Sequence, residues 1–346
     1  MKTRTALALY SGGLDSILAS KLITSLGVNV VCVKFVTPFF DYELLQDQEG
    51  YKQQVMDEYG LNVVLYDLSE NYLDLLHNPS HGFGKNFNPC IDCKILMCTR
   101  IKELMTQYDA SFLISGEVLG QRPMSQRRDT LRVIERDSNN EGLLLRPLSA
   151  KLMTPTVAET EGWIDREKLL DFSGRGRSRQ LQLAKDFGIS NFPTPAGGCT
   201  LADPILSDRI EKIYKGEFVV RPEDIRISDI RLLLGGRQFE VADGGWLILG
   251  RNEQENRKIE GLAEEGDLLL YMPEWPGPTA LLRGYAGTTL SEENIAPAIQ
   301  ESADLVVRYG KKINGKTRES TVEVKMAGDN STAPIYVQSA GLVSAT

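Results

Sequence analysis

The stretch that most constrains this chain is a glycine turn directly after its first apolar segment. Residues 6–10 are largely apolar and predict a buried strand, and the run Ser-Gly-Gly-Leu-Asp-Ser follows at residues 11–16. Apolar residues then recur at helical spacing as far as Leu26. A helix that begins in a glycine turn presents unpaired backbone N–H groups and the positive end of its dipole. The stretch therefore predicts an anion site that a phosphate group can approach closely.

The residues of this turn exclude one common phosphate loop and resemble another. The Gly-Lys-Ser/Thr ending of a Walker A loop is absent. The run resembles the pyrophosphate loop of the ATP pyrophosphatase superfamily, whose members adenylate an oxygen and then displace AMP with a nucleophile. The resemblance implies ATP as cofactor and Asp15 as the carboxylate that helps to place Mg²⁺ among the phosphates. It further implies that the departing pyrophosphate is held by Ser11, Gly12, Gly13 and Ser16.

Strand-like and helix-like segments alternate through the first half of the chain. The segments that read as strands after the first one are residues 28–36, 62–66, 111–115 and 143–145. This alternation predicts an α/β fold with a doubly wound parallel sheet and ligands at the carboxyl edge of its strands. The resemblance implies the same architecture, an adenine nucleotide alpha hydrolase-like fold.

Several residues at the ends of these strands are candidates for nucleotide contacts. The resemblance places Phe35 and Val36 beside the adenine, although Phe35 is equally compatible with core packing. It also implies that Gly116 allows a close approach to ATP, whereas Glu117 departs from the histidine that is common at this position. Arg146 follows another strand and reads either as a contact to phosphate or RNA or as a member of a structural ion pair.

The cysteines form the second chemical feature. The chain has five, three of them within residues 90–98, which fits metal binding or catalysis in a reducing compartment better than a disulfide framework. Asn-Pro leads into Cys90 and Cys93 at the start of a predicted helix, where the helix end lowers thiol pKa values. Cys199 follows two prolines and two glycines, which predicts an exposed turn. In these features the chain resembles tRNA 2-thiouridylases and related tRNA sulfurtransferases.

Two sulfur chemistries are compatible with this resemblance. In the first, Cys199 carries a persulfide and Cys93 resolves it as a disulfide. In the second, Cys90, Cys93 and Cys199 ligate a [4Fe–4S] cluster whose fourth iron is open to sulfide, and the count of three favours this version. We expect Cys98 to be either a core residue or a substitute ligand, and Cys32, inside a valine-rich strand, to be packing.

The pattern of the chain changes near residue 221. A short helix, a hairpin around Asp-Gly-Gly at 243–245 and further strands predict a smaller α+β domain. Its Gly-Arg-Asn-Glu at 250–253 and Pro-Gly-Pro at 276–278 weakly resemble a small RNA-binding domain of ribosome quality-control proteins, although a dimerisation or packing module fits as well. Since 346 residues suffice for two cores, we expect an ATP-binding sulfurtransferase domain at 1–215 and this domain at 221–346.

The charge of the chain limits which binding partners can be expected. A net charge of −8 argues against non-specific nucleic-acid binding but allows local basic strips, which occur at 122–132, 174–179 and 308–318. No apolar run approaches the length of a membrane span and no signal-peptide pattern is present, so we expect a cytoplasmic protein without membrane contact.

The sequence therefore predicts an ATP-dependent tRNA sulfurtransferase that adenylates a nucleobase carbonyl and replaces AMP with sulfur. Its partners would be a tRNA substrate and a sulfur donor, either sulfide or a persulfide carrier, and a homodimer stays open. The alternatives are a persulfide-based tRNA thiolase without a cluster, an amide-forming synthetase with the same loop, and a non-catalytic RNA-binding protein regulated by a nucleotide. The synthetase would need no cysteines, so Cys90, Cys93 and Cys199 count against it.

Overall fold

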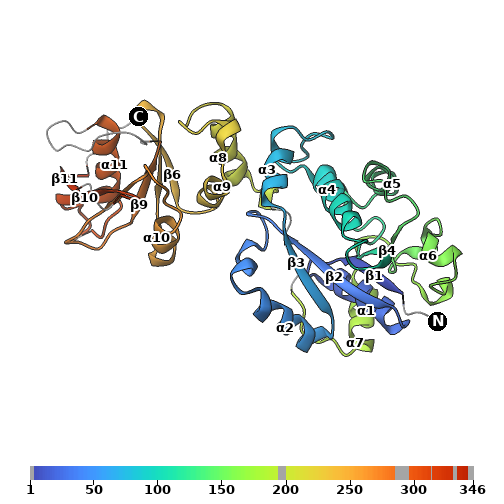
Figure 1. Cartoon of the computed structure of the whole chain (residues 1–346). Coiled ribbons are helices and arrows are strands. Elements are labelled where there is room, and N and C mark those ends of the chain that lie inside the picture. Colours follow the sequence, from blue (N-terminus) through green and yellow to red (C-terminus); the bar gives the residue numbers. More distant parts are fainter. Residues whose placement is uncertain (1–3, 194–199, 285–295, 313, 330–332, 342–346) are drawn as a thin grey trace. The chain divides into compact units, whose positions relative to one another are not determined.

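The computed structural model describes residues 4–193, 200–284, 296–312, 314–329 and 333–341. The chain divides into two compact units, Met1–Ala202 and Asp203–Thr346 (Figure 1). Within the described residues, no helix has both the length and the apolar character needed to cross a lipid bilayer.

The first unit is built on a five-stranded sheet in the order β3-β2-β1-β4-β5, in which every neighbouring pair is parallel. The strands are β1 (Thr5–Leu9), β2 (Asn29–Val36), β3 (Asn62–Asp67), β4 (Ala110–Ser115) and β5 (Leu144–Leu145). The central strand is β1, whose Leu7 lies opposite Val31 on one side and Leu113 on the other. The predicted doubly wound parallel sheet is confirmed, and the loop at residues 11–16 leaves its central strand.

Helices cover both faces of this sheet (Figure 1). They are α1 (Leu14–Ser25), α2 (Gln48–Tyr59), α3 (Ser69–His77), α4 (Cys90–Glu103), α5 (Arg128–Asp137), α6 (Val157–Thr160) and α7 (Ser178–Asp186). The helix predicted to begin at Cys90 is α4, which ends at Glu103. A 3₁₀ turn, Tyr42–Asp47, leads directly into α2.

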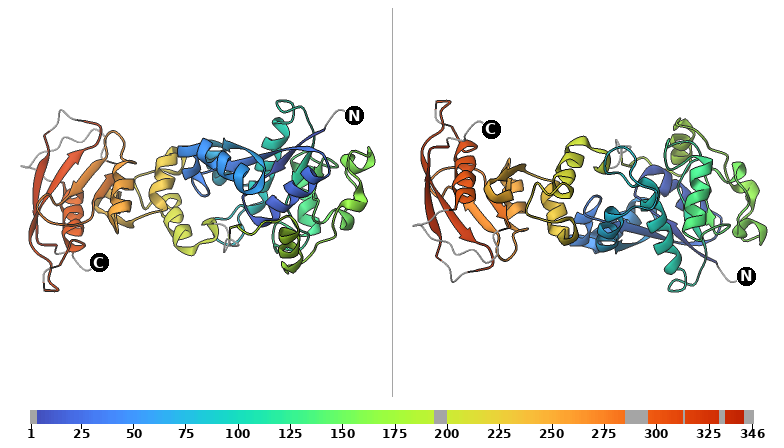
Figure 2. Two further views of the ribbon diagram at one scale, coloured as in Figure 1. Left: turned by 90° about the horizontal axis from the view of Figure 1, so that it is seen from below. Right: turned by 90° about the horizontal axis from the view of Figure 1, so that it is seen from above.

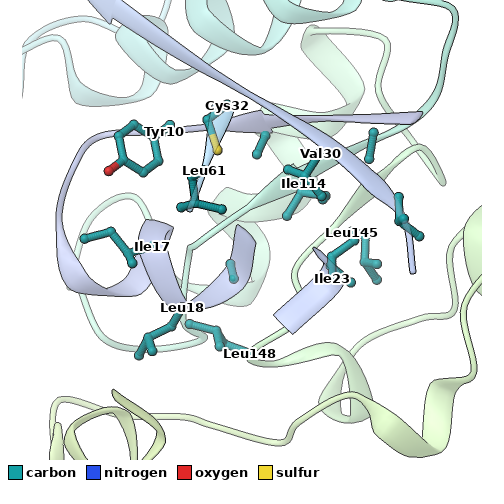
Figure 3. Close-up of a cluster of buried hydrophobic side chains, with 14 of the residues drawn as sticks. Tyr10, Ile17, Leu18, Ile23, Val30, Cys32, Leu61, Ile114, Leu145 and Leu148 are labelled. Atoms are coloured by element: carbon teal, nitrogen blue, oxygen red, sulfur yellow. The ribbon is translucent and has the colours of Figure 1, made fainter. Parts of the chain in front are cut away.

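Alternate residues of the central strands supply the two cores. Ala8 and Cys32 lie in the cluster that includes Ile17 and Ile23 of α1, part of which is drawn in Figure 3. Leu7 and its neighbours on the other face pack with buried residues of α4 and α5. Burial on both faces explains why these strands read as nearly continuous apolar runs. It also fixes the carboxyl edge of the sheet as the place where polar side chains can gather.

The second unit is an antiparallel six-stranded sheet in the order β11-β10-β8-β9-β7-β6. Its strands are β6 (Arg237–Val241), β7 (Gly245–Leu249), β8 (Leu268–Tyr271), β9 (Ala280–Arg283), β10 (Ser320–Met326) and β11 (Ile335–Ser339). Its helices are α8 (Pro204–Tyr214), α9 (Ile227–Leu233), α10 (Glu253–Glu260) and α11 (Pro297–Arg308). Figure 2 shows α11 beside the sheet, where its apolar face joins the core. The predicted smaller α+β domain and its β6–β7 hairpin are confirmed.

The run Gly-Arg-Asn-Glu at 250–253 serves local structure in this unit. Asn252 caps α10, since its side-chain oxygen accepts a hydrogen bond of 3.0 Å from the backbone N–H of Glu255. Arg251 donates from Nε to the Glu255 carboxylate at 2.9 Å. A side chain at Gly250 would collide with the Asn256 amide, 2.0 Å from the added carbon. The run therefore shapes the turn into α10.

Candidate active site at the carboxyl edge of the parallel sheet

The loop after β1 is braced by its own serines. Gly12 has a φ of +79°, a left-handed conformation that favours glycine. The Ser16 hydroxyl donates to the Gly13 carbonyl at 2.8 Å, and the Ser11 hydroxyl donates to Ser16 Oγ at 3.2 Å. No side chain caps the start of α1 at Gly13. The N-terminus of α1 therefore has no side-chain cap on its backbone N–H groups, and such an end of a helix can accept an anion.

A buried lysine supports this loop, and the sequence analysis missed it. Lys34 lies in β2 and is 3% exposed. Its Nζ donates to the Ser11 carbonyl at 2.9 Å and to Asp41 Oδ2 at 2.7 Å. A buried ammonium requires such partners, and here they fix a positive charge directly beneath the loop. The sequence feature that could have revealed it is Lys34 itself, a charged residue within a largely apolar strand.

Asp15 lies in a polar network that reaches across more than a hundred residues of sequence. Gln121 Nε2 donates to Asp15 Oδ2 at 2.7 Å, and Arg177 Nη2 donates to the same oxygen at 3.4 Å. Gln180, which is buried, donates to Gln121 Oε1 at 3.3 Å. Asp15 Oδ1 is buried and accepts no hydrogen bond from the described residues. This orphaned oxygen suits a cation ligand. Arg177, a member of the basic strip at 174–179, faces the loop through its pairing with Asp15.

The end of β4 closes directly on the loop. A Cβ placed on Gly116 would lie 2.6 Å from both the backbone nitrogen and the Cα of Ser16. Glycine is therefore required here by contact with the start of α1, a reason independent of any approach to ATP.

Glu117 and Arg146 form a buried ion pair beside this contact. Arg146, 2% exposed, donates from Nε to Glu117 Oε2 at 3.1 Å and also pairs with Glu135. Lys94 of α4 lies 3.7 Å from Glu117 Oε1. Burial by itself would raise the pKa of Glu117, but Lys94 and Arg146 outweigh it and hold that pKa below its usual value. Of the two predictions for Arg146, the structural ion pair is confirmed.

The start of α4 presents the cysteine pair. Cys90 and Cys93 are half-buried in its first turn, and the Cys93 N–H donates to the Pro89 carbonyl at 2.8 Å. Between them Asp92 accepts from His81 Nδ1 at 2.9 Å, and His81 Nε2 lies 3.1 Å from Asp137 at the end of α5. His81 thus fastens the loop before the cysteines to two helices, a role the sequence did not reveal.

The other described cysteines belong to the core. Burial raises the pKa of Cys32 and of Cys98 to about 12 each, so both thiols stay protonated near neutral pH. Packing is confirmed for Cys32, and for Cys98 the core interpretation holds over that of a substitute ligand. Phe35 and Val36 are buried as well, with the Phe35 ring centroid 6.4 Å from that of Tyr66. Their side chains therefore face the core, and only their backbone could meet an adenine.

Cys199 lies outside the described residues. Among the residues described, no group of three or more His, Cys, Asp or Glu side chains could hold a metal ion. A hydrogen bond joins residues that flank the cysteines in the sequence: the side chain of Asn86, which precedes Cys90, donates to the carbonyl of Ala202, which follows Cys199, at 2.8 Å. This bond ties the segment just after Cys199 to the loop just before Cys90.

The fold and the loop define a class of protein. A parallel sheet in the order β3-β2-β1-β4-β5, whose central strand leads through a glycine turn into an uncapped helix, is a doubly wound α/β domain. Domains of this class bind their ligands at the carboxyl edge of the sheet. The second unit adds a separate α+β domain.

Each unit is similar to a known family. Residues 2–152 match the family described as thiamine biosynthesis protein (ThiI), and residues 236–341 match the NFACT protein RNA binding domain. A probable tRNA sulfurtransferase of Ureaplasma parvum is 28% identical over 181 residues, which cover 51% of this chain and 42% of the relative. Another, from Ureaplasma urealyticum, is 32% identical over 146 residues, which cover 41% and 36%. These findings confirm both resemblances drawn from the sequence, although the chain spans less than half the length of these relatives.

Two solved structures are also similar in part. A 4-thiouridine synthetase in complex with RNA and bound ATP is 21% identical, with 54% of this chain and 52% of that chain covered and a TM-score of 0.34. The U34-tRNA thiolase NcsA from Methanococcus maripaludis with its [4Fe-4S] cluster is 17% identical, with 62% and 67% covered and a TM-score of 0.33. The fold of the first unit is assigned from its own sheet order and not from these two structures.

Proposed function

We propose that the chain is an ATP-dependent tRNA sulfurtransferase that adenylates a nucleobase carbonyl and replaces AMP with sulfur. One chain of contacts carries the proposal. The cysteine helix reaches Glu117 through Lys94 at 3.7 Å, and the adjoining Gly116 touches the backbone of Ser16 in the loop. The anion loop and the thiols therefore share one edge of one sheet, as a single reaction would require.

The loop would bind ATP through its phosphates. Backbone N–H groups of Gly12 and Gly13, together with the Ser11 and Ser16 hydroxyls, would hold the pyrophosphate, and Lys34 beneath them would offset its charge. The orphaned oxygen of Asp15 would help to place Mg²⁺, which bridges carboxylate and phosphate oxygens. The adenine would meet the backbone at the end of β2, near Phe35 and Val36.

The chemistry follows from the poor leaving ability of a nucleobase carbonyl oxygen. Attack of that oxygen on the α-phosphate of ATP releases pyrophosphate and leaves the base carbon bonded to an AMP group. A sulfur nucleophile then adds to this carbon and AMP departs with the original oxygen. Lys34 and the α1 dipole would stabilise the charge that develops on the departing pyrophosphate.

Cys90, Cys93 and Cys199 would hold a [4Fe–4S] cluster. Two thiols in the first turn of α4 would supply two of its ligands, because cysteine sulfur is the usual protein ligand of such clusters. The hydrogen bond between Asn86 and Ala202 supports convergence of the third, since it joins the flanks of the two segments. When bound, the cluster would supply an open iron site for sulfide. In the persulfide alternative, Cys199 would carry the sulfur and Cys93 would resolve it.

The partners follow from the same proposal. The curated relatives are named tRNA sulfurtransferases, and the second unit matches an RNA-binding family, so tRNA is the proposed substrate. The sulfur donor would be sulfide or a persulfide carrier. Cysteine chemistry of this kind calls for a reducing compartment, which favours the cytoplasm. A homodimer is compatible with the proposal but not required by it.

The test is release of AMP and pyrophosphate from ATP in the presence of tRNA. Asp15→Ala should lower the rate about a hundred- to a thousandfold, because removing one preorganised group costs about 3–4 kcal/mol in the barrier. Asp171→Ala is the matched control, since that carboxylate pairs with Arg179 away from the loop. Near-normal AMP formation by Asp15→Ala would remove the pyrophosphate-loop assignment. AMP formation that does not depend on RNA would favour an amide-forming synthetase, and no AMP formation at all would favour a nucleotide-regulated RNA-binding protein.

A further inference from the structure

The second unit carries a surface of interleaved cations and aromatic rings, which we name the α11-end surface. It consists of Arg237, Trp275, Tyr309, Lys311, Lys312 and Arg318. The Arg237 guanidinium lies 4.7 Å from the centre of the Tyr309 ring, and that of Arg318 lies 5.3 Å from the Trp275 ring. Trp275 Nε1 donates to the Lys311 carbonyl at 2.7 Å, which joins the two arginine–aromatic pairs into one continuous surface.

The cations of this surface form no ion pairs with described residues. The segment 308–318 holds five cations and no carboxylate, in a chain whose net charge is −8. Within the described parts of the chain, neither these five nor Arg237 forms an ion pair. Other arginines of the same unit do, and these are Arg226, Arg251, Arg257 and Arg283. The negative end of the α11 dipole can account for cations in the last turn of that helix but not for those contributed by other segments.

The two remaining basic strips of the sequence behave differently. Arg127 pairs with Asp129 in the first, and Arg179 pairs with Asp171 in the second. Arg177 of the second strip is held at Asp15, in the candidate active site. Carboxylates therefore neutralise named members of both strips, whereas strip 308–318 retains its positive field.

We propose that the α11-end surface is the RNA-docking surface of the second unit. Its lysines and arginines would contact phosphates, and the exposed ring of Tyr309 would stack on an unpaired base. This chemistry suits RNA better than an acidic protein, because carboxylate partners give no use to the aromatic faces. The inference rests on the proposed function for the identity of the RNA, namely the tRNA that the first unit would thiolate.

The experiment compares two triple variants of the full chain that remove the same charge. Lys311→Gln/Lys312→Gln/Arg318→Gln changes the α11-end surface, and Arg127→Gln/Arg179→Gln/Arg257→Gln changes exposed arginines that already pair with carboxylates. Binding of a fluorescent tRNA transcript is measured by anisotropy at salt concentrations between about 50 and 200 mM.

The slope of log K against log salt is negative, and its magnitude decreases when phosphate contacts are lost. We expect this magnitude to decrease by about three units in the first variant and by less than one in the second. Tyr309→Leu should weaken binding roughly five- to hundredfold and leave the slope unchanged, because stacking releases no counterions. Circular dichroism of each variant checks that the fold is retained.

Equal slopes in the two triple variants would overturn the proposal. So would polyglutamate competing as strongly as tRNA at equal charge, since the surface would then accept any polyanion. Thionucleoside formation measured on the same preparations separates this inference from the proposed function. If the two triple variants differ in slope as expected but no thionucleoside forms, only the proposed function is refuted. If thiolation is normal but the two slopes are equal, only the proposed docking surface is refuted.

Discussion

Replacing Arg146 with methionine should strongly lower the free energy of unfolding of the first unit. The substitution keeps most of the side-chain volume but removes the charge that pairs with Glu117 and Glu135. Glu117 is 5% exposed and would keep only Lys94, at 3.7 Å. Leaving one partner of a buried ion pair uncompensated costs about 3–5 kcal/mol. A domain is stable by only about 5–15 kcal/mol, so Arg146→Met should remove about a fifth of that stability or more.

The pH dependence identifies the cause of this loss. In the unchanged protein the pKa of Glu117 is depressed, so its pairing contributes stability above the unfolded pKa of about 4.3 and loses it as the pH falls through the folded pKa. Without Arg146, burial raises the pKa of Glu117, and the carboxylate destabilises the folded state near neutral pH. The deficit of the variant should therefore be largest near pH 7 and shrink toward about pH 4.

The assay is urea unfolding followed by hydrogen exchange in peptides of β1 and β4, which reads the first unit separately from the second. The double variant Arg146→Met/Glu117→Gln should recover much of the loss, because no buried charge is then left unpaired. Arg179→Met, which breaks an exposed pair, should change stability little. A deficit of equal size at both pH values, or no recovery in the double variant, would refute the electrostatic reasoning and assign the loss to packing.

Three further outcomes are expected. Lys34→Met should raise the KM for ATP and slow AMP formation while tRNA binding stays normal, and unchanged ATP kinetics would show that the buried ammonium does not serve the loop. Gly116→Ala should displace the start of α1 and abolish AMP formation, whereas Gly176→Ala, where an added Cβ meets nothing within 4 Å, should be silent in the same assay. Protein purified without oxygen should be brown, with about four irons and four sulfides per chain, lost in Cys90→Ala and kept in Cys98→Ala. Colourless protein that still thiolates tRNA would leave the persulfide route.

The parts of the site that lie within one short segment could be predicted from the sequence. The turn at 11–16 and the cysteine pair at 90–93 can each be recognised from residue types at close spacing. The alternation of strands and helices places both at one edge of the sheet. The parallel sheet followed for the same reason, since its strands are buried on both faces and read as apolar runs.

Contacts that join distant segments could not be predicted in the same way. Asp15 meets Gln121 and Arg177 across 106 and 162 residues, and no local pattern records such pairings. Arg177 was therefore assigned to the basic strip in which it stands. For Arg146 the sequence left two roles open, a contact to phosphate or RNA and a structural ion pair. The choice depended on Glu117 lying next to Arg146 in space.

The run at 250–253 bears on how domains of this kind are recognised in other chains. Gly250, Arg251 and Asn252 are occupied by the turn and the cap of α10, and the α11-end surface lies in other segments. In this chain these residues are therefore committed to local structure. RNA recognition, as proposed above, would depend instead on the cations and aromatic rings of the α11-end surface. A search for RNA binding in similar domains would accordingly compare the residues at the end of α11.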